Sequence, residues 1–393
     1  MSHGPDEAAA RWAVAWLTRA AEPGSAPVHA LVQAAGAAEA VRLIRAGQAP
    51  ASVLSAVGRR QEDRTDADLF AAQRCGLRLV APWDDEWPGA VLHPMILATA
   101  RGLLDLAPPL GLWVRGQGRL DEALENAVAV IGSRASTAYG EHVAAEISFG
   151  LADRGWTVVS GGALGIDGAA HRAALSAEGA TVAVLAGGLD RPYPAAHGAL
   201  FERIAERGLL VSEWPPGCAP YRHRFLIRNR LIAGLSAGTV VVEAAARSGT
   251  ASTARRCRDL GRPVMAVPGP VTSAASVGTH ELLRGEGEDG ARLVCSADQV
   301  LQEVGRIGAD LARRPREAPS VRDALAPTAA AVLEAVPVRR AAPPERIALA
   351  AGLSVLEVLR VLPALELQDL VELTAEGWRL AAAARRRSGR EPG

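Results

Sequence analysis

Glycine-rich turns with hydroxyl side chains follow several short apolar runs in the middle of this sequence. The first is Gly132-Ser133-Arg134, which follows the run AVAVI and precedes a helix-forming stretch. Glycine lets a ligand approach the backbone, serine donates a hydrogen bond, and arginine adds charge beside a helix N-terminus, which itself attracts anions. The turn therefore predicts a phosphate or anion site. It matches neither GxGxxG nor GxxxxGK[ST], so neither a dinucleotide nor an NTP held in the usual manner is implied.

Two further turns have a similar composition. Ser160-Gly161-Gly162 ends the second apolar run, and Ser248-Gly249-Thr250 precedes another helix-forming stretch. In an open parallel sheet, ligands bind outside the carboxyl ends of the strands, so the residues at these ends are weighted most heavily. We expect the turns at Gly132 and Gly161 to lie side by side and to form a cradle.

Asp167 and His171 are four residues apart, on one face of the helix expected after Gly162. Such a pair could act as a general acid and base. We favour a simpler interpretation, in which Asp167 caps the helix start and His171 lies on the helix surface. After the third run, Gly187-Gly188 and Tyr193-Pro194 predict a rigid turn rather than a ligand contact. We predict no catalytic residue.

The densest basic segment is YRHRFLIRNR, from Tyr221 to Arg230. If this segment is helical, Arg224 and Arg228 share one face. The face toward the sheet then carries Phe225, Leu231, Ile232 and Leu235. Aromatic rings on which bases stack, together with guanidinium groups that follow phosphates, are what a single nucleic-acid strand requires. The segment therefore predicts a contact with single-stranded nucleic acid.

The elements that must position these residues can be read from the apolar runs. The runs are AVAVIG, WTVVSGG, TVAVLAGG, LLVSE, GTVVVEA, PVMAVPG and ARLVCS, and amphipathic stretches separate them. Strands that are apolar throughout are buried on both faces, and helical crossovers between them give a parallel sheet. The expected fold class is α/β, with a doubly wound, Rossmann-like parallel sheet of about six or seven strands.

The flanking regions predict further domains. Residues 1–75 have apolar positions at helical spacing and predict a helical, SAM-like N-terminal domain, and residues 76–305 hold a Pro- and Trp-rich connecting layer followed by the Rossmann-like domain. A linker is expected over 306–326 and a disordered tail over 386–393. Residues 327–385 read as three helices and a short strand-like segment, which is the outline of a winged helix.

Composition limits the possible functions. Hydrophobic residues make up 49% of the 393 residues and charged residues 22%, so a globular protein is expected. The 43 cationic residues, all arginine, balance 43 acidic ones, so any nucleic-acid site must be local. The four cysteines form no CxxC pair, which favours neither a zinc site nor a disulfide framework. Without a leader-like N-terminus or a long apolar run, we expect a cytoplasmic protein that makes no membrane contact.

The chain resembles the DNA-processing protein A family, also called DprA or Smf, of bacterial transformation proteins. The resemblance rests on ordered strings over about residues 128–283: IGSRASTAYG, SGGALGIDGAAHRAAL, LAGGLDRPYP, SEWPPG, FLIRNRLIAGLS, VVVEAAARSGTASTA, GRPVMAVPGP and SVGTHELL. It implies a protein that binds and protects single-stranded DNA and loads the RecA recombinase, as a homodimer. Where the family has FPxRNR, this chain has Leu226 in place of proline, and His280 stands where the family has asparagine.

By resemblance, Ser133, Arg134 and the turn at Ser160 line a phosphate pocket, with Arg228-Asn229-Arg230 alongside. The predicted DNA-binding residues are Gly132, Ser133, Arg134, Ser160, Gly161, Gly162, Arg224, Arg228, Asn229, Arg230, Ser248, Gly249 and Thr250. No metal and no cofactor are predicted. The leading hypothesis is sequence-independent binding of single-stranded DNA without catalysis.

Two alternatives remain open. One is a nucleotide N-glycosidase, because related phosphoribohydrolases use a similar sheet, although their PGGxGTxxE signature is missing here. The other is a duplex-reading regulator that acts through the winged helix. The last helical stretch, SVLEVLRVLPALELQDL, carries Arg360 as its only cation, which is too little charge for strong duplex binding.

Overall fold

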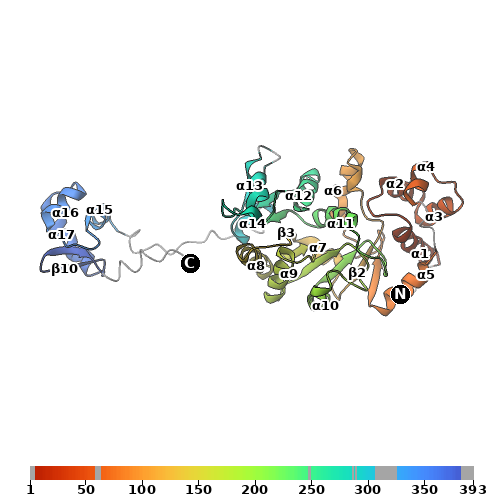
Figure 1. Cartoon of the computed structure of the whole chain (residues 1–393), viewed down its shortest axis with the longest axis horizontal. Coiled ribbons are helices and arrows are strands. Elements are labelled where there is room, and N and C mark those ends of the chain that lie inside the picture. Colours follow the sequence, from red (N-terminus) through yellow and green to blue (C-terminus); the bar gives the residue numbers. More distant parts are fainter. Residues whose placement is uncertain are drawn as a thin grey trace. The chain divides into compact units, whose positions relative to one another are not determined.

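The computed structural model describes residues 5–57, 63–246, 249–285, 287, 290–305 and 325–381. The chain divides into two compact units, Met1–Arg313 and Arg314–Gly393. Figure 1 shows the larger unit with its central sheet and the smaller C-terminal unit. Most of the predicted linker, 306–324, and the predicted tail, 386–393, lie outside the described residues.

A bundle of short helices opens the larger unit. The helices are α1 (Pro5–Ala20), α2 (Ala26–Ala35), α3 (Ala37–Arg45), α4 (Ala51–Val57) and α5 (Thr65–Arg74). Their buried side chains, such as Trp16 and Leu17, join one apolar cluster with Trp113 and Phe201 of the sheet domain. The bundle therefore shares a core with the sheet.

The sheet has nine strands. They are β1 (Leu77–Val80), β2 (Leu112–Arg115), β3 (Ala127–Ile131), β4 (Thr157–Ser160), β5 (Thr181–Leu185), β6 (Leu209–Ser212), β7 (Thr239–Val241), β8 (Val264–Ala266) and β9 (Arg292–Leu293), in the order β1-β2-β6-β5-β4-β3-β7-β8-β9. The seven strands from β6 to β9 in this order run parallel. All seven predicted strands are present, and the doubly wound α/β fold is confirmed.

Two antiparallel strands extend this sheet where the sequence predicts only a connecting layer. β2 pairs with β6, and β1 pairs with β2. Each strand has only four residues and stands among prolines and tryptophans, so neither gives a clear pattern in the sequence. Leu112, Trp113 and Val114 are nevertheless fully buried. Burial of β2 therefore makes the connecting segment part of the sheet.

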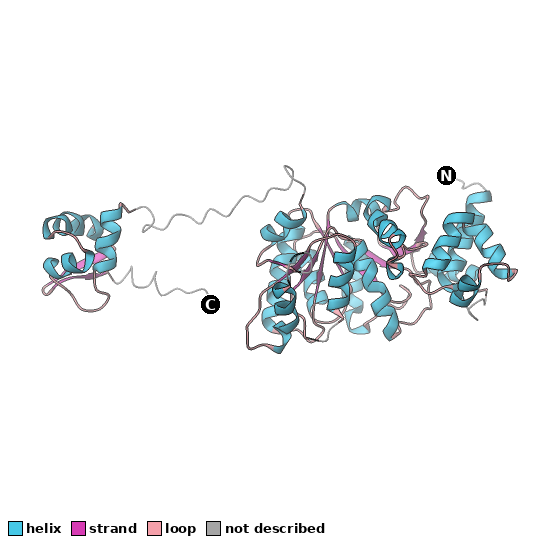
Figure 2. Cartoon of the chain, turned by 90° about the horizontal axis from the view of Figure 1, so that it is seen from above, coloured by secondary structure: helices cyan, strands magenta, loops and turns pink. Residues whose placement is uncertain are grey.

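Helices cover both faces of the sheet (Figure 2). They are α6 (Gly89–Ala100), α7 (Leu120–Glu125), α8 (Ala138–Asp153), α9 (Ile166–Ser176), α10 (Gly198–Arg207), α11 (Arg222–Gly234), α12 (Thr250–Asp259), α13 (Val277–Arg284) and α14 (Ala297–Val304), with short 3-10 turns η1 (Leu104–Leu106), η2 (Ala195–His197) and η3 (Ala274–Ser276). Buried residues of α6, α7, α11 and α12 share one cluster, while those of α8, α9 and α14 share another. The strands are buried on both faces, as their apolar runs require.

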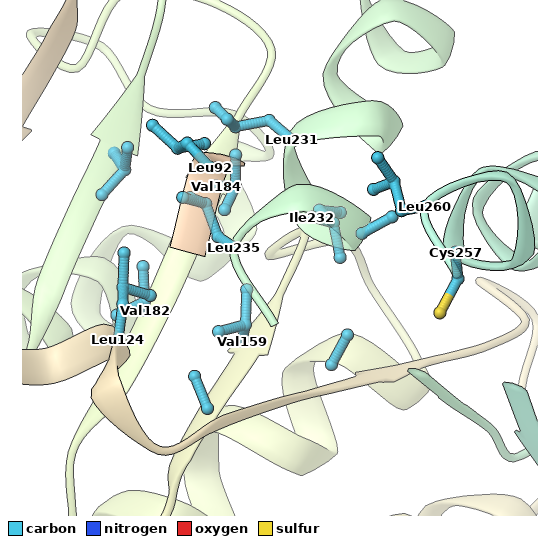
Figure 3. Close-up of a cluster of buried hydrophobic side chains, with 14 of the residues drawn as sticks. Leu92, Leu124, Val159, Val182, Val184, Leu231, Ile232, Leu235, Cys257 and Leu260 are labelled. Atoms are coloured by element: carbon cyan, nitrogen blue, oxygen red, sulfur yellow. The ribbon is translucent and has the colours of Figure 1, made fainter. Parts of the chain in front are cut away.

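Helix α11 is fixed to the sheet by its C-terminal half. Leu231, Ile232 and Leu235 are buried in the same cluster as Val159 of β4 and Val184 of β5 (Figure 3). This packing anchors the predicted basic helix above the carboxyl ends of the strands. The arginines of α11 are spread from Arg222 to Arg230, and Arg222 and Arg228 line the site described below.

The C-terminal unit contains α15 (Pro327–Ala335), α16 (Pro344–Ala351), α17 (Val355–Glu366) and an antiparallel pair, β10 (Val371–Thr374) and β11 (Gly377–Leu380). Gly352 ends α16 in the left-handed conformation at φ 66°, and Ser354 and Glu357 form a capping box that begins α17. The segment expected to be one short strand is a hairpin. Three helices followed by a hairpin is the element order expected for a winged helix.

No single helix in the described ranges is long and apolar enough to cross a membrane, although α16 and α17, bent by 105°, pass this test together by length and composition.

Candidate functional site

A cavity of about 730 Å³ lies at the carboxyl ends of β3 and β4. β3 is the strand from which the chain order diverges, with β4 on one side and β7 on the other. Open α/β sheets bind their ligands at such a switch point. The lining residues include Gly132, Ser133, Arg134, Asp167, Tyr193, Arg222, His223, Phe225, Leu226, Arg228, Asn229, Gly249, Thr250 and Thr253.

The loops after β3 and β4 lie against one another, as predicted for the cradle. The backbone N–H of Ile166 donates to the carbonyl of Ser133 at 3.2 Å. A Cβ on Gly132 would lie 2.6 Å from the side chain of Ile166, and one on Gly165 would lie 2.4 Å from the Ser133 carbonyl oxygen. Only glycine fits at these two positions, so the glycines serve the contact between the two loops.

Arg134 and Arg222 supply accessible positive charge at the cavity. Both side chains are exposed and line it. Within the described ranges, neither guanidinium pairs with a carboxylate. The guanidinium carbon of Arg134 lies 4.9 Å from the centre of the Phe225 ring. Both charges are therefore available to an anionic ligand.

Arg228 lines the cavity and is buried. Its guanidinium donates to the carbonyl oxygens of Gly161, at 2.7 Å, and Val184. Burial lowers the pKa of Arg228 to about 10, an effect that the nearby Asp167 carboxylate opposes. The group therefore stays charged at neutral pH and adds a buried positive charge to the lining of the cavity.

Asp167 holds the turn before its helix in place. Its Oδ2 accepts hydrogen bonds from the backbone N–H groups of Gly161, at 3.1 Å, and Ala163, at 3.3 Å. Burial raises the pKa of Asp167, whereas Arg228 and these N–H groups lower it. The carboxylate therefore binds the preceding turn, and the N-cap position of α9 belongs to Gly165 instead.

The prediction that His171 lies on the helix surface is wrong. His171 is fully buried and its Nδ1 lies 2.7 Å from Oγ1 of Thr181. The Thr181 hydroxyl donates to the carbonyl of Val158, so it accepts from His171, and the imidazole carries its proton on Nδ1. Burial lowers the pKa of His171 to about 3. The residue packs inside the fold and does not reach the cavity.

The N-terminus of α8 already holds an anion from within the chain. The buried Glu243 carboxylate accepts hydrogen bonds from the backbone N–H of Thr137, at 3.0 Å, and from the Thr137 hydroxyl. A Cβ on Gly140 would lie 2.2 Å from the carboxyl carbon of Glu243. The helix terminus expected to attract a phosphate is thus occupied by Glu243. The positive charge exposed beside this terminus is the side chain of Arg134.

The start of α12 contributes a second helix N-terminus to the cavity. Gly249, Thr250 and Thr253 line it, and the first turn of α12 carries no acidic residue. Asn229 joins this turn to α11, because its Nδ2 donates to the carbonyl of Gly249 at 3.3 Å. Ser248 lies outside the described residues. Of the predicted turn, Gly249 and Thr250 therefore lie at the site.

Five of the predicted residues stand behind the cavity rather than in its wall. The buried Ser160 donates to the carbonyl of Val130 at 2.7 Å. Gly161 binds Arg228 and Asp167, and Gly162, at φ 68°, packs against Phe201. Arg224 pairs with Glu22 at 2.8 Å and Arg230 with Glu213 at 2.6 Å. These five residues do not line the cavity.

Tyr193 and Phe225 line the cavity, whereas the sequence places Tyr193 in a structural turn and Phe225 on the face toward the sheet. Tyr193, in the turn interpreted as purely structural, is 53% exposed, and its ring meets that of Phe225 edge-on at 5.9 Å. Phe225 is half-buried and does not join the core cluster under the sheet. Tyr193 lies in the loop after a strand. The rule that ligands bind at the carboxyl ends of parallel strands therefore also applies to Tyr193.

The described ranges contain no group of three or more His, Cys, Asp or Glu side chains that could hold a metal ion.

Comparison with known proteins assigns the chain to a family. The family model for DNA recombination-mediator protein A matches residues 78–305. A Mycobacterium tuberculosis protein named as a DNA processing protein DprA is 50% identical over 379 residues, which is 96% of each chain. The Escherichia coli protein Smf is 42% identical over 197 residues, covering 50% of this chain and 51% of its own length.

The X-ray structure of DNA processing protein A (DprA) from Streptococcus pneumoniae has a TM-score of 0.54 and 32% identity, and the match covers 68% of this chain and 91% of that one. The family model, a relative matched along nearly the whole chain and this similar fold agree with one another. The chain belongs to the DNA recombination-mediator protein A family, also known as DprA or Smf.

Proposed function

We propose that the cavity binds single-stranded DNA without reading its sequence and without changing it chemically. The observation that carries the proposal is the pairing of accessible guanidinium groups with aromatic rings. Arg134 and Arg222 carry charge that no carboxylate in the described ranges neutralises, and Phe225 and Tyr193 offer ring faces and edges beside them. Guanidinium groups follow phosphates and aromatic rings stack on any base, so this combination binds a strand regardless of sequence.

The backbone elements of the cavity fit the same ligand. The N-terminus of α12 and the turns at Gly132 and Gly249 offer N–H groups to phosphate oxygens. Of the predicted residues, we propose that Gly132, Ser133, Arg134, Arg228, Asn229, Gly249 and Thr250 line the DNA path, and we add Arg222, Tyr193 and Phe225. Ser160, Gly161, Gly162, Arg224 and Arg230 would support this path from behind.

The carboxylates near the cavity favour binding over catalysis. Asp167 is engaged by two backbone N–H groups, and Glu243 is engaged by Thr137. A nucleotide N-glycosidase needs a carboxylate that is free to act on a sugar, and these two are held in structural roles. This arrangement speaks against the phosphoribohydrolase alternative.

The exposed face of α17 speaks against duplex reading by the C-terminal unit. Leu356 and Leu359 are exposed on this helix, and Arg360 is its only cation. A helix that enters the major groove needs polar and cationic side chains. We therefore propose that residues 327–385 form a separate winged-helix module whose role does not depend on duplex DNA.

The cellular setting of this activity rests on the family alone. We propose that the protein acts in the cytoplasm as a homodimer, protects incoming DNA and delivers it to the RecA recombinase. These steps follow from the family resemblance, and the cavity contributes only the binding of the strand.

The test is fluorescence anisotropy with a labelled single-stranded oligonucleotide and a duplex of equal length, measured across salt concentrations. We expect the single strand to bind more tightly, and Arg134→Ala and Arg222→Ala each to reduce the salt slope by about 0.7. Arg203→Ala, which removes an exposed arginine of α10 outside the cavity, is the matched control. Tighter duplex binding that both cavity variants leave unchanged would refute the proposal. Release of free base from a nucleoside monophosphate would instead favour the enzyme.

A further inference from the structure

The turn that follows α1 reaches across to the basic helix α11. Oε1 of Glu22 accepts hydrogen bonds from Nη2 of Arg224, at 2.8 Å, and from Nε of Arg224, at 3.3 Å. Oε2 of Glu22 accepts one from the indole N–H of Trp214 at 3.2 Å. Glu22 belongs to the N-terminal helical bundle, and Arg224 stands 202 residues further along the chain.

The guanidinium of Arg224 is enclosed at this contact. It lies over the rings of Trp214, at 5.5 Å, and Tyr221, at 5.1 Å, and its Nη1 donates to the carbonyl of Ala219 at 2.9 Å. Only 8% of Arg224 is exposed. The side chain therefore links the bundle to the segment 219–221, from which α11 begins.

A second contact lies further along the same helix. Arg230 is 1% exposed and pairs with the buried Glu213 at 2.6 Å. Gly24, at φ +80°, packs so closely on Arg230 that a Cβ there would lie 2.7 Å from its Nε. The turn 22–24 thus touches two arginines of α11.

The residues of α11 that line the cavity stand between and beside these two arginines. Arg222 and Phe225 flank Arg224, and Arg228 and Asn229 precede Arg230. We propose that Glu22 is a positioning residue for the strand-binding site: by holding Arg224, it sets the start of α11 so that Arg222 and Phe225 face the strand. The inference rests on the proposed function of the cavity and extends it to a residue of the helical bundle.

An opposite role for Glu22 would be competition, in which its carboxylate keeps Arg224 away from DNA phosphate. The enclosure of Arg224 speaks against this role. The guanidinium lies over two aromatic rings and bonds the carbonyl of Ala219, and only 8% of Arg224 is exposed, so a phosphate has little access to it. Arg224 also does not line the cavity. The two roles predict opposite changes in DNA affinity.

The experiment compares Glu22→Gln, Arg224→Gln and the double variant in the full-length protein. Affinity for a labelled single-stranded oligonucleotide is measured by anisotropy across salt, with Glu39→Gln, which neutralises an exposed carboxylate of α3, as control. We expect each single variant to weaken binding by about fivefold or more, the double variant to be no weaker than the singles, and the salt slope to stay unchanged. The salt slope should stay unchanged because the loss of a positioning residue displaces the groups that contact the strand but removes no phosphate contact.

Amide hydrogen exchange supplies a readout of position itself. In Glu22→Gln, exchange at residues 219–226 is expected to accelerate while exchange in the sheet core stays unchanged. The inference fails if Glu22→Gln tightens binding and raises the salt slope by about 0.7, the outcome expected of a competitor. It also fails if Glu22→Gln leaves affinity unchanged while Arg134→Ala weakens it. A wild-type protein that binds no single strand would instead overturn the proposed function.

Discussion

The guanidinium carbon of Arg134 lies 4.9 Å from the ring centre of Phe225, so a cation from the loop after β3 faces an aromatic ring from α11. A contact of this kind contributes about 0.5–1 kcal/mol at an exposed site. The contact also places a guanidinium that can bind a phosphate next to a ring on which a base can stack.

Phe225→Ala should weaken binding of a single strand by about 1–3 kcal/mol, because a base loses its stacking surface. Phe225→Tyr should retain most of the affinity. The salt slope should not change, since no phosphate contact is removed. Anisotropy titrations across salt concentrations measure the affinity of each variant and its salt slope. Phe149→Ala, at an exposed aromatic of α8, is the control, and an equal loss in both alanine variants would contradict the assignment of Phe225.

Gly140→Ala should destabilise the fold by more than about 2 kcal/mol. The new Cβ would meet the carboxyl carbon of Glu243 at 2.2 Å, so either Glu243 or the start of α8 must move. Urea unfolding measures the change in free energy. Gly198→Ala is the matched control, since its Cβ meets nothing within 4 Å and its φ is −50°. That variant should be neutral or slightly stabilising, and similar effects of both alanines would contradict the proposed contact.

Glu213→Gln should destabilise the fold by about 3–5 kcal/mol, because it leaves Arg230 as an uncompensated buried charge. Replacing both members, as Glu213→Leu with Arg230→Met, should recover much of that loss, since it removes both buried charges. The free energy of unfolding in urea is the measurement. A double variant that is less stable than Glu213→Gln would show that the ion pair itself stabilises the fold.

Acid should weaken the fold through His171. Burial lowers the pKa of His171 from about 6.5 to about 3 in the folded chain. Between these values the unfolded chain binds a proton that the folded chain does not. Stability from this group is therefore fully present above about pH 6.5 and is lost as the pH falls toward 3, with a slope approaching about 1.4 kcal/mol per pH unit.

The measurement is the unfolding free energy as a function of pH, compared between the wild type and His171→Asn. The variant should be less stable at neutral pH, because it disturbs the contact with Thr181. Its stability should also depend less on pH between 6 and 4. Curves of equal slope would show that His171 does not contribute to the acid sensitivity.

The strands and the position of the site were predictable from the sequence because both follow local rules. Apolar runs such as AVAVI mark strands buried on both faces, and the rule on carboxyl ends locates Gly132, Gly161 and Gly249 near the cavity. The short strand β2 was not predicted because its four residues stand in a segment rich in proline and tryptophan, which gives no clear strand pattern.

The sequence does not predict which partner each arginine of α11 binds. Helical spacing places Arg224 and Arg228 on neighbouring positions, yet one binds Glu22 and the other binds the carbonyl of Gly161. The acidic partner Glu22 lies 202 residues away in the chain. A helix in which arginines are buried on several sides shows no simple polar face, so only the tertiary partners decide which arginine reaches the ligand.

Glu243 at the start of α8 has a consequence for how the site could respond to the cell. Because the carboxylate belongs to the chain, its effective concentration at Thr137 is fixed by the fold and does not depend on any metabolite. A free nucleotide would have to displace this internal anion before it could use the same helix terminus. Glu243 should therefore occupy the N-terminus of α8 at any nucleotide concentration. This terminus then does not respond to the energy charge or the redox state of the cell.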